Sequence, residues 1–179
     1  MAKSTTRKSG AGKSSSSQLE EYFFNELKDV YGAEKQLVKA LPKMRKAATT
    51  EELKEALDEH LAITQEQIAR LEEVFELLDK KPQSKKCEAM EGITKEGESV
   101  IEETESGSMT RDAAIIMAAQ KVEHYEIAAY GGLVTLAKTM GKNEVAELLA
   151  QTLEEEKEAD QLLTEIAESS INEGADMES

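Results

Sequence analysis

The chain has 179 residues, of which 33% are charged and 4% aromatic, and its formal net charge at pH 7 is −15. This length favours one globular domain with tails over two full domains, and the acidic balance excludes a globally basic nucleic-acid binder. No apolar run is long enough for a transmembrane helix, and the N-terminus lacks the apolar stretch of a secretory signal. We therefore expect a cytoplasmic, helical protein, and the single cysteine, Cys87, fits a reducing compartment.

The first 17 residues differ from the rest of the chain. They are mainly Ser, Thr, Gly and Lys, and they carry four basic residues and no acid, so residues 18–179 bear a net charge of −19. Because this segment has no hydrophobic periodicity, we expect a disordered basic tail over residues 1–17. Two roles stay open for it: a flexible leader, or a contact with nucleic acid or another polyanion.

Two helices are expected next, each with hydrophobic residues at helical spacing. Ser17 and Glu20 have the spacing of a capping box at the start of the first helix. Pro42 is expected to end or kink this helix. Thr49 and Glu52 repeat the box and start a second helix, which runs to about residue 80.

The second half of the chain has the same organisation. A third long helix is expected from Thr110 to Gly141, and a fourth from Asn143 to about residue 170. Short turns make the partners of each pair antiparallel, whereas the long connection over residues 82–110, with a short amphipathic helix, can return the chain to the other end. The sequence predicts an all-α fold, a four-helix bundle over residues 18–170 with one long crossover, followed by an acidic C-terminal tail over residues 171–179.

Each long helix carries polar residues on the side that is otherwise hydrophobic. At 100° per residue, most acidic side chains fall outside the hydrophobic faces, but a few fall within them. In chain order they are Glu34; His60, with Thr64 and Gln67; Glu123 and Glu126; and Glu156 and Asp160.

These positions also agree in height along the predicted bundle. At a rise of about 1.5 Å per residue, the imidazole and the five carboxylates lie about 18–24 Å from one end. Five buried carboxylates require cations, and no Lys or Arg interrupts the hydrophobic faces at that height. Oxygen-rich ligation with one imidazole suits iron or manganese better than zinc. We expect two such ions; a mononuclear site, a protonated carboxyl network or an error in the helix phases are the alternatives.

Four segments carry a family resemblance. Residues 29–37, 86–91, 120–130 and 153–157 resemble the YciF/YciE stress-protein family, which has the domain of unknown function 892, over about residues 18–170. The resemblance implies a ferritin-like four-helix bundle, a homodimer, and a role in bacterial stress with a dinuclear site related to those of rubrerythrin and manganese catalase.

The candidate ligands depart from the usual ferritin-like set of two Glu and two Glu-x-x-His motifs. His60 has Leu57 and Ile63 at the three-residue positions, so its partner Glu is missing. In the fourth helix Asp160 stands in place of the expected His, one residue later, and Glu126 adds a carboxylate beside Glu123.

The leading hypothesis is a non-haem oxidoreductase, peroxidase- or catalase-like, that holds two iron or manganese ions per chain and reacts with peroxide or oxygen. Glu126 and Glu156 are the expected bridging ligands, and no separate proton-transfer residue can be assigned. Tyr31 and Tyr130 lie near the ligands, where packing is favoured over a bond to a ligand or a radical. The alternative is a non-enzymatic dimeric stress or interaction protein with a structural or vestigial metal site; iron storage is a weaker third hypothesis.

Overall fold

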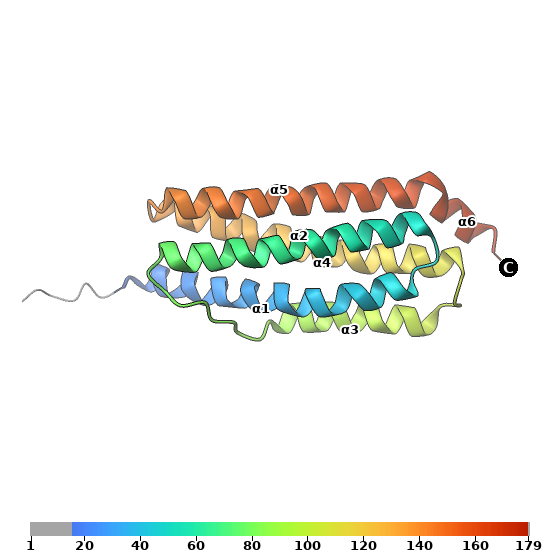
Figure 1. Ribbon diagram of the computed structural model, residues 1–179, viewed down its shortest axis with the longest axis horizontal. Coiled ribbons are helices and arrows are strands. Elements are labelled where there is room, and N and C mark those ends of the chain that lie inside the picture. Colours follow the sequence, from blue (N-terminus) through green and yellow to red (C-terminus); the bar gives the residue numbers. More distant parts are fainter. Residues whose placement is uncertain (1–15, 179) are drawn as a thin grey trace, which may run out of the picture.

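The computed structural model describes residues 16–178, which form a bundle of four long helices with a shorter helix and a C-terminal extension packed against it (Figure 1). The expected basic tail lies outside these residues, apart from Ser16 and Ser17. The elements are α1 (Gln18–Ala47), α2 (Glu51–Leu77), α3 (Glu88–Glu103), α4 (Met109–Thr139), α5 (Asn143–Ile166), the π-helical turn η1 (Ala167–Ile171) and α6 (Asn172–Asp176).

The order of the helices in space confirms the predicted crossover. α1 and α2 are antiparallel, as are α4 and α5, and α3, which joins the two pairs in the sequence, runs back along one side of the bundle (Figure 1). α2 and α4 therefore run in the same direction. α3 packs against α1 and α4, which makes it an addition to the four-helix bundle rather than one of its four members.

Both ends of α1 follow from local sequence and packing. Ser17 and Glu20 form the predicted capping box, in which each side chain accepts from the other residue's backbone N–H. Pro42 does not end the helix, which continues to Ala47. Leu41 and Met44 on either side of the proline are buried, so packing of this last turn outweighs the backbone hydrogen bond that proline cannot make.

The start of α2 is held differently from the prediction. The capping residue is Thr50, and its side chain makes no capping hydrogen bond. Instead the fully buried carboxylate of Asp112 on α4 accepts from the backbone N–H groups of Thr49 and Thr50, at 2.6 and 2.8 Å, and from the Thr50 hydroxyl at 2.7 Å. A side chain far away in sequence thus supplies the cap and ties the α1–α2 turn to α4.

The segment that leads into α3 presses closely on α1. The Lys85 N–H donates to the Lys28 carbonyl at 2.9 Å, and a Cβ placed on Gly32 would lie 1.8 Å from the Lys85 carbonyl oxygen. Gly32 therefore permits the contact that positions the crossover. Cys87, free and buried, caps α3 by accepting from the Met90 N–H.

Residues 171–176 are helical where we expected an acidic C-terminal tail. The helix continues through η1 and α6, and Ile171 is fully buried. The Glu178 carboxylate accepts from the backbone N–H groups of Met109 and Thr110, at 2.6 and 3.0 Å. An acidic residue at the end of the chain thus satisfies free donors at the N-terminus of α4, where negative charge is favourable.

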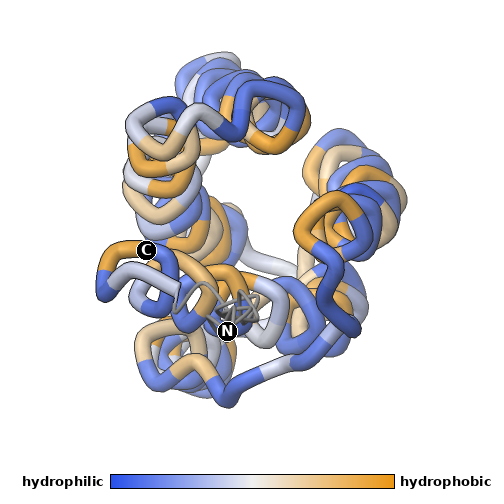
Figure 2. The backbone as a smooth tube through the Cα atoms, turned by 90° about the vertical axis from the view of Figure 1, so that its left-hand side faces the viewer, coloured by the Kyte–Doolittle hydropathy of each residue, from blue (hydrophilic) through white to orange (hydrophobic). Residues whose placement is uncertain are grey.

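The hydrophobic interior is divided into two clusters along the bundle axis. Seen down that axis, the helices turn hydrophobic segments toward the interior (Figure 2). One cluster includes Leu41, Leu57 and Ile115, and the other includes Phe23 and Phe75. On every long helix the clusters are separated by the polar positions singled out above. Within residues 16–178, no helix combines the length and hydropathy needed to cross a membrane.

Candidate metal centre

Four predicted ligands converge in the layer between the two hydrophobic clusters. His60 comes from α2, Glu123 and Glu126 come from α4, and Glu156 comes from α5, and one nitrogen or carboxylate oxygen from each lies within 4.8 Å of all the others. Nε2 of His60 lies 3.5 Å from Oε1 of Glu123. All four side chains are buried. The structure therefore assembles from three helices a set of groups that are metal ligands in other proteins.

Glu34 on α1 adjoins this cluster. It is fully buried, and the Tyr130 hydroxyl donates a hydrogen bond to its Oε1. The charges of Glu126 and Glu156 are close enough to couple to that of Glu34. Glu34 thus places a fourth helix against the same polar layer.

Asp160 is the predicted ligand that the structure does not bring into the cluster. Its side chain is 24% exposed, its Oδ1 accepts from Gln120 Nε2 at 3.1 Å, and the same oxygen lies 3.4 Å from His124 Nε2. The His124 side chain is 70% exposed, so it faces away from the cluster. Asp160 lies one turn beyond Glu156. The rotation of about 40° over four residues turns its side chain away from the cluster and toward Gln120 of α4.

Buried polar atoms without a partner are concentrated at this centre. Most buried polar side-chain atoms in proteins make at least one hydrogen bond. Among residues 16–178, every buried side-chain nitrogen or oxygen that has none belongs to this layer. These atoms are Oε2 of Glu34, both ring nitrogens of His60, Oε1 of Gln67, Oε2 of Glu123, both carboxylate oxygens of Glu126 and Oε2 of Glu156.

Burial sets the protonation of these groups. It raises the pKa values of Glu34, Glu123, Glu126 and Glu156 above their usual range, and the negative charges of neighbouring carboxylates add to the effect. Burial also lowers the pKa of His60 to about 4, so its imidazole is neutral at pH 7 and keeps a lone pair. Burying the ionised carboxylates costs free energy. A cation that replaced the carboxyl protons would reduce that cost, because it compensates the buried negative charge.

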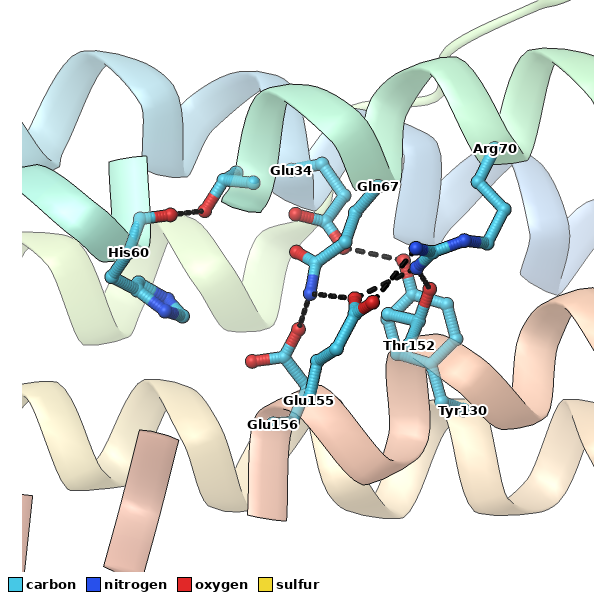
Figure 3. A network of polar contacts seen from close by, with 9 residues as sticks. Glu34, His60, Gln67, Arg70, Tyr130, Thr152, Glu155 and Glu156 are labelled. Atoms are coloured by element: carbon cyan, nitrogen blue, oxygen red, sulfur yellow. Dashed lines mark hydrogen bonds and ion pairs between the residues drawn. The ribbon is translucent and has the colours of Figure 1, made fainter. Parts of the chain in front are cut away.

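Gln67 and Arg70 on α2 extend the polar layer (Figure 3). Gln67 Nε2 donates to Glu156 Oε1 at 2.5 Å and to Glu155 Oε2 at 3.1 Å. The Arg70 guanidinium binds both Glu155 oxygens at 2.7 Å and the Thr152 hydroxyl at 2.7 Å. Gln67 therefore orients Glu156, while Arg70 and Glu155 form a neighbouring ion pair.

Arg70 does not interrupt the hydrophobic face of α2, but its side chain reaches the polar layer from beside that face. Its charge lowers the pKa values of Glu34 and Glu156, although burial has the larger, opposite effect. Its hydrogen bonds go to Glu155 and Thr152, so it does not neutralise the cluster. Gln67 was singled out from the sequence because it follows His60 by two helical turns on the same face, whereas Arg70, whose side chain is 15% exposed, lies off that face and gives no such signal.

The two tyrosines near the centre have different roles. Tyr130 is fully buried and bound to Glu34. Tyr31 instead donates to Glu72 at 2.6 Å and packs edge-on against Phe75. Only Tyr130 therefore acts directly on a residue of the polar layer.

Comparisons with known proteins agree with this architecture. Residues 18–176 match the family described as domain of unknown function (DUF892). The chain is 48% identical over 159 residues to the protein YciF of Escherichia coli strain K12, covering 88% of this chain and 95% of that protein.

Solved structures of related proteins have the same fold. The crystal structure of the E. coli stress protein YciF superposes with a TM-score of 0.83, covering 87% of this chain and 98% of that chain. YcfI from Rhodopseudomonas palustris, 40% identical, superposes with a TM-score of 0.81 over 86% of this chain and 97% of that chain. On this evidence the all-α, ferritin-like chain with its buried carboxylate and histidine cluster belongs to the DUF892 family, which includes the stress protein YciF.

Proposed function

We propose that the polar layer binds two iron or manganese ions per chain and that the protein is a non-haem oxidoreductase reacting with peroxide or oxygen under stress. The observation that carries the proposal is the concentration of unpartnered buried donors and acceptors in one carboxylate-rich layer. Such groups are costly without a partner, and two cations would supply partners for the carboxylate oxygens and for one ring nitrogen of His60. The stress protein YciF among its relatives gives the context.

The residues divide naturally between two ions. His60 and Glu123 belong to the compact group that also contains Glu126 and Glu156, whereas Glu34 lies outside that group and interacts with the charges of Glu126 and Glu156. We therefore assign Glu126 and Glu156 as the bridging ligands. Both Glu126 oxygens are free of protein partners, as a bridging carboxylate requires.

The donor set suits iron or manganese. The layer offers carboxylate oxygens and one imidazole, and the only cysteine of the chain is hydrogen-bonded to Tyr125 outside the cluster. Zinc sites with a structural role prefer thiolate and imidazole, whereas oxygen-rich sets suit harder cations and redox-active iron or manganese. Bound as a pair, such ions supply two-electron redox chemistry and Lewis acidity.

The side chains of the protein position the ligand groups, and its hydrophobic clusters shield them. Tyr130 fixes Glu34, and Gln67 fixes Glu156 through one oxygen and leaves the other free. Neutral His60 offers a nitrogen lone pair without first losing a proton at pH 7. The hydrophobic clusters above and below keep bulk water from the layer, which strengthens the electrostatic interactions within it.

Metal analysis of protein purified without chelator tests the first half of the proposal. After loading with iron or manganese, two ions per chain and oxygen release from hydrogen peroxide are expected. The Glu126→Met variant should lose both metal and turnover, whereas Glu147→Met, at an exposed position of α5, should lose neither. Fewer than one ion per chain, with no turnover after loading, would refute the enzyme proposal.

A structural role for the metal is the alternative. The layer lies between two hydrophobic clusters and joins all four long helices, so bound ions would also cross-link the bundle. In this case the protein would act as a metal-stabilised homodimer that binds another stress protein. Two ions per chain that raise the unfolding temperature without peroxide or oxygen turnover, in a particle with the mass of a dimer by light scattering, would favour this role.

A further inference from the structure

A pocket of about 180 Å³ opens beside the candidate metal centre, between α2, α4 and α5. Its wall is mainly aliphatic and includes Ile63 of α2, Ala119 of α4 and Leu162 of α5. His60 and Glu123 line it, whereas Glu34, Glu126 and Glu156 do not. The pocket therefore reaches the metal centre from one side only, that of the imidazole.

His60 and Glu123 bring polar atoms without hydrogen bonds to the pocket wall. His60 and Glu123 are 8% and 2% exposed, and both ring nitrogens of His60 and the Oε2 of Glu123 lack hydrogen bonds. A ligand with one hydroxyl-type group would find an acceptor or a donor there. Because these groups are already desolvated, such a hydrogen bond costs little further desolvation.

The size of the pocket bears on the kind of ligand. A water molecule occupies about 30 Å³ in the liquid, and a buried cavity of about 150 Å³ accepts benzene in other proteins. A pocket of about 180 Å³ is therefore larger than molecular oxygen or hydrogen peroxide requires. It matches an organic group of roughly six to nine carbons, whose burial against aliphatic side chains is favourable.

Charge at the pocket excludes one class of ligand. Glu59 and Glu158 line it and are exposed, and Glu155 lines it while paired with Arg70. The two exposed carboxylates repel anions. The Arg70 guanidinium is bound to Glu155 and Thr152, so it does not offer a binding site for a carboxylate ligand.

We propose that this pocket binds a neutral organic molecule of about six to nine carbons, its apolar part against the aliphatic wall and a single hydroxyl-type group at His60 and Glu123. This inference rests on the proposed function and deepens it, because it gives the metal centre an organic substrate class in addition to peroxide or oxygen. The binding site itself is built from side chains of this chain alone.

Benzyl alcohol is the probe, and benzoate, of nearly the same shape but anionic, is its matched competitor. Binding is measured by titration calorimetry and by methyl NMR shifts at Ile63 and Leu162, on the protein as purified and after chelation. Saturable binding of benzyl alcohol, at least tenfold tighter than that of benzoate, is expected in the chelated protein. No saturable binding, or equal binding of benzoate, would overturn the proposal.

Two variants block the pocket from opposite walls, so the test survives if one of them fails to fold. Ala159→Phe on α5 and Ala56→Phe on α2 should each weaken binding at least tenfold, while Ala150→Phe, on α5 outside the pocket, should leave it unchanged. Unchanged affinity in a folded blocking variant would place the probe elsewhere and overturn the proposal. Because the chelated protein is tested, absence of metal or turnover would refute the proposed function without changing this result.

Discussion

Replacing Glu126 with Met should make the metal-free protein more stable and at the same time abolish its stabilisation by metal. Glu126 is fully buried, neither of its carboxylate oxygens has a partner, and its pKa is raised by burial and by the charges of Glu34 and Glu156. Methionine has a similar volume and no polar atoms to desolvate. The substitution therefore removes a cost from the empty site and a ligand from the occupied one.

The magnitude follows from the burial. An unpartnered buried polar group costs about 1–3 kcal/mol, and replacing buried ionic groups with apolar residues of similar volume stabilises proteins by about 1–4 kcal/mol. We expect metal-free Glu126→Met to gain about 2–4 kcal/mol in free energy of unfolding, or about 5–10 °C in Tm for a chain of this size. With metal at a hundredfold excess over its Kd, the unsubstituted protein gains about 2.7 kcal/mol for each bound ion, and Glu126→Met gains nothing.

Urea unfolding at pH 7.5, with chelator and then with manganese or ferrous iron, measures both effects. Glu147→Met, on the exposed side of α5, is the control and should shift stability by less than about 0.5 kcal/mol in either condition. The reasoning is refuted if metal-free Glu126→Met is less stable than the unsubstituted protein. Metal stabilisation that persists in the variant would show that Glu126 is not a ligand.

Three further predictions concern the same layer and its supports. The buried carboxyls have higher pKa values in the folded than in the unfolded chain, so their contribution to stability is full below about pH 4.5 and is lost as the pH rises through the folded values. Urea unfolding of chelated protein should show stability falling by up to about 1.4 kcal/mol per pH unit for each such group. A rise in stability between pH 5 and 8 would contradict this. Tyr130→Phe leaves Glu34 Oε1 without its hydrogen-bond donor and should lower the stability of the chelated protein by about 1–3 kcal/mol. Metal titration of this variant should show weaker binding. An unchanged melting curve and an unchanged metal affinity would argue against the role given to Tyr130. Asp112→Ala removes three accepted hydrogen bonds at the α1–α2 turn. It should lower the free energy of unfolding in urea by about 2–4 kcal/mol without changing the metal stoichiometry. A decrease of less than about 0.5 kcal/mol would show that the cap is dispensable.

Much of the fold and of the polar layer was predictable because both depend on periodicity. The hydrophobic residues of each long helix repeat at helical spacing, and a polar residue on such a face must be buried if the face is buried. Glu34, His60, Glu123, Glu126 and Glu156 were found in this way, and all five are buried in the structure. Equal height along the bundle then sufficed to predict that residues on different helices meet.

What sequence did not reveal depends on contacts between residues that are far apart in the chain. The Asp112 cap joins α4 to a turn about 60 residues earlier, and the Glu178 carboxylate closes the start of α4 from the far end of the chain. Neither contact has a local motif. The same is true of the Gly32 contact with Lys85, where the sequence shows a glycine inside a helix but not the backbone that presses on it.

Asp160 shows why periodicity alone is a coarse guide to a site. It shares a hydrophobic face with Glu156 in the sequence, but a four-residue step turns it by 40°, enough for it to pair with Gln120 rather than point inward. Gln67 takes part in the layer from a position that periodicity does identify, but periodicity did not show its role, which is to hold Glu156 by one oxygen. Because Gln67 carries no charge, it adds a donor and an acceptor to the layer without adding to the repulsion among the buried carboxylates. It leaves the negative charge of the centre to the four glutamates, and that charge is what two divalent cations would balance.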